Sequence, residues 1–121
     1  MNINILYQYY INFDVVVKNQ TKYLKVTSDI IPHLYGYFIK QYPEHLLENI
    51  VPAINNALNG NPFDSDGGGI FHFLEIGSTV SSFEDDQNNR YELPTADVKE
   101  IIMAYIDWIN ENNLEQYIQN N

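Results

Sequence analysis

Alternation of apolar and polar residues near the start of the chain predicts a β-hairpin. Residues 7–17 are aromatic and β-branched, and apolar side chains alternate with polar ones from Phe13 onward. Asn19-Gln20 is typical of a turn, and residues 22–27 alternate again. We therefore expect two antiparallel strands that are joined at Asn19-Gln20.

Apolar residues spaced three and four apart then predict two helices. In the first, Asp29 is the expected N-cap, and Pro32 falls in the first turn, where proline is tolerated. The second runs from about Pro43 to residue 58, and Pro52 should kink or split it. Asn59-Gly60 is a typical C-terminal stop.

The second half of the chain predicts strands followed by one long helix. Residues 61–69 have the composition of a loop. Residues 70–76 are apolar on both faces, which favours a central strand. Residues 79–84 and 90–93 should form a hairpin, and Thr95 should cap a helix over residues 96–112, followed by a short turn at 114–118.

This order of elements predicts a single α+β domain over residues 1–121. We expect one antiparallel sheet of about four to five strands, packed against a single layer of three main helices. A chain of 121 residues suits one domain with its own core. Cysteine is absent, which excludes disulfides and thiolate metal sites.

The net charge is distributed unevenly along the chain. Up to Gly60, four acidic residues are balanced by four lysines; from residue 61, twelve acidic residues are accompanied only by Arg90 and Lys99, which gives the formal net charge of -10. Such a surface repels nucleic acid and phospholipid and attracts basic proteins. No signal peptide or membrane span is evident, so we expect a cytoplasmic protein.

The C-terminal helix carries the sharpest candidate interface. With residues about 100° apart, the apolar positions fall on one arc and the acidic ones on a narrow stripe with Ala104 in its middle. Trp108 borders the stripe, and the predicted hairpin tip at residues 84–86 could extend it. A solvated helix face is the alternative interpretation. The candidate partner-binding residues are Glu84, Asp85, Asp86, Asp97, Glu100, Asp107, Trp108 and Glu111.

Catalytic and metal-binding patterns are weak. Asp64-x-Asp66-Gly67 resembles the start of a calcium loop, but Phe73 stands where a bidentate glutamate is needed. His45 and Glu48 lie one helical turn apart without a third ligand. His72 should be a hydrogen-bonded sheet residue and His33 an exposed one. We expect no metal site, no cofactor and no enzymatic activity.

The segment from Arg90 to Asn110, RYELPTADVKEIIMAYIDWIN, runs from a strand through a Leu-Pro-Thr turn into an isoleucine-rich helix with a tryptophan. It resembles the C-terminal end of small immunity proteins from bacterial contact-dependent growth inhibition and polymorphic toxin systems. The resemblance implies a cytoplasmic protein that binds and neutralises one cognate toxin, often a basic nuclease.

Two other functions stay open at this point. An acidic adaptor or nucleic-acid mimic would bind several basic proteins, whereas an immunity protein would bind one. A small enzyme would use His33, His45 or His72 for acid–base chemistry. The sequence names neither the toxin nor the oligomeric state, for which a monomer is the expectation.

Overall fold

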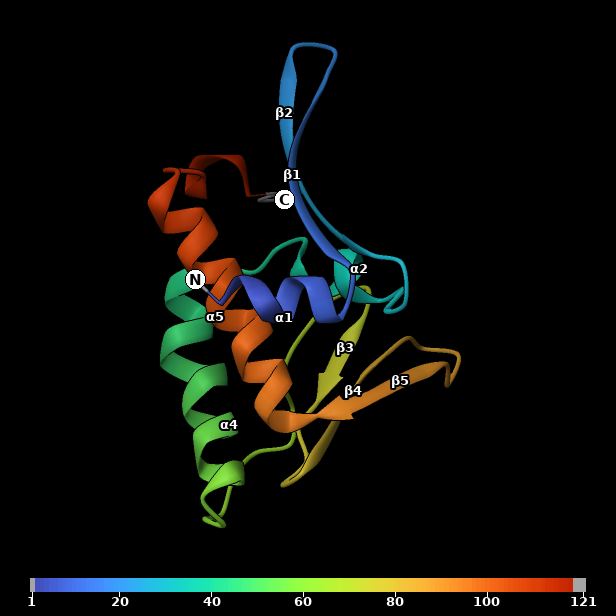
Figure 1. Cartoon of the computed structure of the whole chain (residues 1–121), viewed down its shortest axis with the longest axis vertical. Helices are drawn as coiled ribbons and strands as arrows, with labels where there is room; N and C mark the ends of the chain where they lie inside the picture. The colour runs from blue at the N-terminus through green and yellow to red at the C-terminus, as the bar shows by residue number, and fades with distance from the viewer. Residues whose placement is uncertain (1, 119–121) are drawn as a thin grey trace.

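The computed structural model describes residues 2–118, which form an α+β fold with two separate antiparallel sheets (Figure 1). A two-stranded sheet pairs β1 with β2, and a three-stranded sheet has the order β3-β4-β5. The strands are β1 (Ile11–Lys18), β2 (Thr21–Ser28), β3 (Phe73–Glu75), β4 (Val80–Glu84) and β5 (Arg90–Pro94). The helices are α1 (Ile3–Gln8), α2 (Leu34–Phe38), α3 (Pro43–His45), α4 (Val51–Leu58) and α5 (Thr95–Glu111), with a π-helical turn η1 (Leu46–Ile50) and a 3-10 turn η2 (Glu115–Tyr117).

The α+β class is confirmed, but the arrangement differs from one sheet covered by three helices. The first strands pair only with each other, and α1 is an additional helix. Asn2 caps α1 by accepting a hydrogen bond from the backbone N–H of Ile5 at 3.4 Å. Tyr7 therefore lies in a helix and not in the predicted strand, which begins only after Tyr10 turns the chain at φ 53°.

The predicted N-terminal hairpin is confirmed, and its turn is at Asn19-Gln20. Both turn residues have positive φ values, 53° and 65°, as a type I′ turn requires. The register sets Val15 opposite Leu24 and Val17 opposite Lys22. The hairpin extends away from the rest of the molecule (Figure 1).

The first predicted helix is shorter than expected, because α2 begins only at Leu34, after Pro32, and His33 stands at its N-cap without a side-chain hydrogen bond. The expected cap at Asp29 is replaced by a turn that precedes the helix. The hydroxyl of Ser28, not the carboxylate of Asp29, accepts hydrogen bonds from the backbone N–H groups of Ile30 and Ile31 at 3.1 and 3.0 Å. The predicted split at Pro52 is confirmed. Proline has no N–H to donate, and the helix widens just before it into the π-helical turn η1.

The three-stranded sheet has β4, not the predicted segment 70–76, at its centre. Only Phe73–Glu75 of that segment is a strand, and it lies at the edge. Ile70 and Phe71 are each 56% exposed, so apolar composition did not reflect burial on two faces. The loop at residues 65–68 covers the outer edge of β3, because Gly67 N–H donates to the Leu74 carbonyl at 2.8 Å.

The long helix α5 supplies much of the core, as its apolar arc predicts. Val98, Ile101, Ile102, Tyr105, Ile106 and Ile109 are all buried. Buried residues from both halves of the chain belong to one hydrophobic cluster. Two details are corrected. Ala104, placed on the acidic stripe, is only 1% exposed, and Thr95 does not cap the helix through its side chain.

Thr95 instead closes a small ring of hydrogen bonds with the start of β4. Gly77 N–H donates to the Ser81 hydroxyl at 3.1 Å, the Ser81 and Thr95 hydroxyls are 2.6 Å apart, and the Thr95 hydroxyl donates to the Gly77 carbonyl at 2.7 Å. Thr95 is completely buried. Its hydroxyl is therefore unavailable to the first turn of α5, where Pro94 stands at the N-cap.

Candidate acidic interface

The three-stranded sheet has one buried face and one solvent-facing face. Leu74, Phe83 and Leu93 point inward and are buried. Because side chains alternate along a strand, their neighbours share the opposite face. That face carries Phe73, Glu75, Val80, Glu84, Arg90 and Glu92. With Asp85 and Asp86 of the adjoining hairpin tip, we call this surface the acidic sheet face.

Arg90 is the single basic residue of the acidic sheet face and is held in its middle. Its guanidinium lies 3.4 Å from a carboxylate oxygen of Glu75, 3.8 Å from one of Glu84 and 3.0 Å from the Ser82 hydroxyl. Two of the five carboxylates of this face thus lie within 4 Å of its one cation. Exposed ion pairs of this kind add little stability. Because five acidic residues outnumber the one arginine, the surface keeps a negative formal charge.

Two of the predicted tip acids have structural roles. The Asp85 carboxylate accepts hydrogen bonds from the Asn89 side-chain amide at 2.9 Å and from the backbone N–H groups of Asn89 and Gln87 at 3.0 and 2.9 Å. These bonds, that from the Asn89 amide above all, lower the pKa of Asp85. Glu84 accepts from the Ser82 hydroxyl at 2.9 Å. Asp86 is exposed.

Apolar side chains are exposed among these charges. Phe73 is 36% exposed and Val80 is 50% exposed, both on the acidic sheet face. Phe71, just before β3, is 56% exposed. Aromatic and aliphatic anchors bordered by charge are typical of protein–protein interfaces, in which a few apolar residues contribute most of the binding energy.

The predicted stripe on α5 is partly occupied by the chain's own N-terminal segment. Asp97 accepts a hydrogen bond from the Tyr9 hydroxyl, and Glu100 accepts one from the Asn2 amide at 3.2 Å. Burial, together with Asp97, raises the pKa of Tyr9 well above its usual value. The N-terminal part of the stripe therefore stabilises the fold by holding α1 against α5.

The other end of the stripe is more open. Trp108 is half-buried, and its ring stacks on Phe13 of the N-terminal hairpin, with centroids 5.0 Å apart and planes at 24°. Asp107 is half-buried, whereas Glu111 is exposed. We call these two carboxylates and the exposed Glu115 of η2, which follow one another along the C-terminal end of α5 and the turn after it, the acidic helix end.

The hairpin tip and the stripe do not form one surface. β5 connects the tip to the start of α5, and five extended residues span about 16 Å. The tip lies at the end of this hairpin remote from α5, and the helix runs away from the sheet (Figure 1). The structure thus separates the candidate residues into two groups.

The histidines do not form a recognisable catalytic or metal site. His33 is buried, contrary to its predicted exposure, and its ring lies 5.0 Å from that of His72. Neither Nδ1 atom has a hydrogen-bond partner, so the expected hydrogen bond of His72 is not seen at this atom. Burial and His72 lower the pKa of His33. Within residues 2–118, no three His, Asp or Glu side chains are arranged to hold a metal ion.

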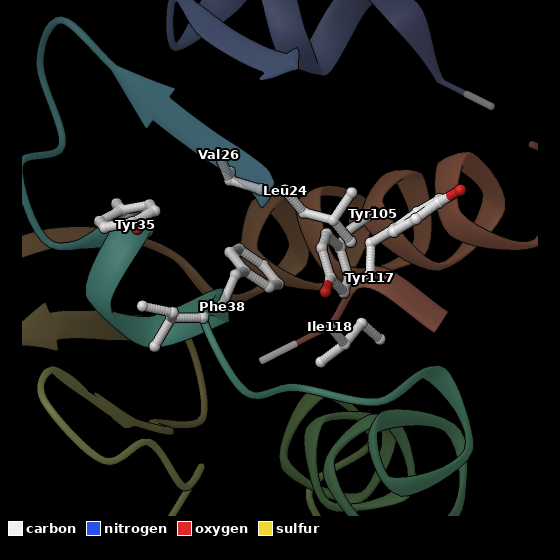
Figure 2. A pocket seen from close by; sticks show the side chains of 8 residues that line it. Leu24, Val26, Tyr35, Phe38, Tyr105, Tyr117 and Ile118 are labelled. Carbon is white, nitrogen blue, oxygen red and sulfur yellow. The ribbon is translucent and has the colours of Figure 1, made fainter. Parts of the chain in front are cut away.

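The enclosed crevice beneath the N-terminal hairpin is too small for a ligand. Leu24 and Val26 of β2 line it with Phe38 of α2 and Tyr105 of α5, and Ile118 lies on the side of the C-terminal segment (Figure 2). Its volume is about 10 Å³, close to the minimum that holds one water molecule. We interpret this crevice as imperfect packing within the core.

Sequence reasoning missed Phe73, Glu75, Val80 and Glu92 as members of one face. These residues share a face only through the strand register, which sets Glu75 opposite Ser82 and Ser82 opposite Glu92. The register was not available from the sequence, since the predicted strand at residues 70–76 was too long.

Comparisons with known proteins leave the family open. No protein-family model matches the chain, and the searches of curated proteins and of solved structures find no match. No helix within the described part of the chain is both long and apolar enough to cross a membrane.

Proposed function

We propose that this chain is an immunity protein that binds and neutralises a basic toxin domain through the acidic sheet face. The observation that carries the proposal is an uncovered sheet surface with five carboxylates, one arginine and two exposed apolar side chains. An acidic face of this kind complements the cationic groove of an enzyme that acts on nucleic acid. Phe73 and Val80 would supply the apolar contact.

Charge complementarity also suits the task of such an inhibitor. Opposite charges accelerate diffusional encounter, and the acceleration falls as ionic strength rises. A protein that guards against a lethal enzyme benefits from rapid capture. In this proposal the chain acts in the cytoplasm by occupying its target, without catalysis and without a cofactor.

The acidic helix end supports a second docking surface for the same function. Glu111 is exposed there, and Trp108 lies beside Asp107 in the chain. Asp97 and Glu100 are weaker candidates for direct contact, because their carboxylates already accept hydrogen bonds from Tyr9 and Asn2. Of the two surfaces, the acidic sheet face combines more carboxylates with more exposed apolar area.

Co-expression tests the proposed function. Where a large secreted protein with a variable C-terminal domain is encoded immediately upstream, that domain is expressed in a bacterium with or without this chain. We expect growth arrest by the domain alone and normal growth when both are made. An unrelated basic toxin domain is the control, since an adaptor or mimic would also protect against it. Growth arrest despite abundant soluble chain would contradict the proposal.

A further inference from the structure

The N-terminal hairpin presents an unpaired strand edge. β1 pairs with β2 along its whole length, and among residues 2–118 no other segment forms a backbone hydrogen bond with β1. The hairpin projects from the molecule, and Val17 near its turn is 64% exposed (Figure 1). An exposed edge with unpaired N–H and C=O groups is a template for another strand.

The turn determines which backbone groups that edge offers. In a two-residue hairpin the pair flanking the turn, Lys18 and Thr21, exchanges both hydrogen bonds, and bonded and non-bonded pairs then alternate. Val16 and Asp14 therefore direct their N–H and C=O groups toward β2. The corresponding groups of Val15 and Val17 point outward from the free edge of β1.

These outward groups fit an antiparallel copy of the same strand. If a two-fold axis passes through Val16, Val15 of one copy lies opposite Val17 of the other, and the two pairs exchange four backbone hydrogen bonds. The same register sets Asp14 opposite Lys18 of the second copy, twice. Shifting the axis to Val15 would set Asp14 opposite a valine, and shifting it to Asp14 would oppose like charges.

The outer face of the hairpin is also continuous across such a pair. Tyr23 lies opposite Val16 within the hairpin, so pairing two copies at Val16 makes an apolar row of two tyrosines and two valines. Asp14, opposite Lys25 in its own hairpin, would then lie between two lysines. The β2 edge offers no equivalent, because its charged residues, Lys22 and Lys25, are both basic.

We propose that two copies of this chain associate through β1, antiparallel about Val16, to form a four-stranded sheet from two N-terminal hairpins. The occupant of the free edge is a second copy because β1 is complementary to itself in charge, in apolar side chains and in backbone hydrogen bonding. The acidic sheet face takes no part in this contact. The dimer and the proposed toxin binding are therefore independent.

Disulfide trapping tests the register, since the chain has no native cysteine. In a non-bonded antiparallel pair, the Cα atoms opposite each other are about 4.5 Å apart, within the range for a disulfide. Val16→Cys should therefore give a covalent dimer rapidly under mild oxidation. In the control Val17→Cys, the two thiols are diagonal neighbours about 7–8 Å apart at Cα and should couple slowly. Equal coupling rates would overturn the register.

Charge reversal tests the partner. Sedimentation equilibrium should show reversible dimers of the wild type, and dimerisation about tenfold weaker or worse for Lys18→Asp and for Asp14→Lys alone. Mixing these two variants should restore a heterodimer, because each aspartate then faces a lysine. Restoration excludes misfolding as the cause of the loss. A wild type that stays monomeric to millimolar concentration would overturn the proposal.

Proline substitutions, which remove a backbone N–H group, test which edge of the hairpin makes the contact. Val17→Pro removes an outward N–H without removing a bond between β1 and β2, and it should weaken the dimer. Lys22→Pro, directly opposite in the same hairpin, removes an outward N–H from the other edge and serves as the matched control. Equal loss of dimer in both variants, with unchanged circular dichroism, would place the contact outside β1.

Discussion

Substitutions at Thr95 distinguish between two roles for its side chain, as a helix cap or as a member of a buried hydrogen-bond ring. Thr95→Val keeps the shape of the side chain but removes the hydroxyl that donates to the Gly77 carbonyl and contacts Ser81. Each buried polar group left without a partner costs about 1–3 kcal/mol. With two such groups, we expect the free energy of unfolding to fall by about 3 kcal/mol, or Tm by about 10 °C in a domain of this size.

Urea denaturation monitored by fluorescence measures this loss directly, because Trp108 is the only tryptophan. Thr95→Ser keeps the hydroxyl and should lose only about 1 kcal/mol for the missing methyl group. Ser81→Ala combined with Thr95→Val should cost less stability than the sum of the single changes. The reason is that Ser81→Ala removes the hydroxyl whose contact with Thr95 is already lost in Thr95→Val.

Thr95→Asp gives the result that decides between the two roles. Aspartate is a better N-cap than threonine and suits the helix dipole, so a capping residue would tolerate the change. At a position that is completely buried, the same carboxylate should destabilise the fold severely. A Thr95→Asp variant as stable as the wild type would refute the reasoning.

Other changes follow from local geometry. Gly36→Ala should destabilise the fold by about 1–3 kcal/mol in urea denaturation, despite the better helix propensity of alanine, because the new Cβ would lie 1.7 Å from Nδ1 of His72; adding His72→Ala should recover most of the loss. Tyr10→Gly should raise the free energy of unfolding by about 0.5–1 kcal/mol, because Tyr10 has φ 53°, which favours glycine, and its side chain is 63% exposed. A lower Tm for this variant would contradict the idea that the backbone is strained at Tyr10. The pKa of His33 is lower in the folded state than its unfolded value of 6.5, so the unfolded state takes up the proton first. Stability should therefore fall as the pH drops below about 6.5, and His33→Gln should reduce the pH dependence of the urea midpoint between pH 5 and 7.

Local pattern and turn chemistry predicted much of the fold. The hairpin at Asn19-Gln20, the break at Pro52 and the buried arc of α5 all follow from rules about neighbouring residues. The predictions that were wrong concern contacts between residues that are far apart in the chain. Thr95 is a good cap by type, but residues of the β3–β4 connection and of β4 use its hydroxyl, and no local rule indicates that contact.

The candidate site shows the same division. The helical projection separated the acidic positions of α5 from its buried arc but placed the buried Ala104 among them. It could not show that Asn2 and Tyr9, at the two ends of α1, bind Glu100 and Asp97. The acidic sheet face depends on strand register, which brings Glu75 and Glu92 to either side of Ser82 from positions far apart in the chain. Charge composition predicted a negative surface, and tertiary pairing determined its location.

The most direct test of the central claim compares three double variants of equal charge in binding to the toxin domain. Asp86→Lys with Glu92→Lys alters the acidic sheet face. Glu111→Lys with Glu115→Lys alters the acidic helix end. Glu44→Lys with Glu48→Lys, at exposed positions in α3 and η1, is the control. Each pair changes the formal net charge by four, from -10 to -6.

Affinity is measured by titration calorimetry at two salt concentrations, after circular dichroism has shown that each variant is folded. The account predicts that the variant of the acidic sheet face loses at least about a hundredfold in affinity together with most of the salt dependence. The control should change little, and the variant of the helix end should retain most of the affinity. Equal effects of all three variants, or a loss confined to the helix end, would contradict the assignment of the acidic sheet face.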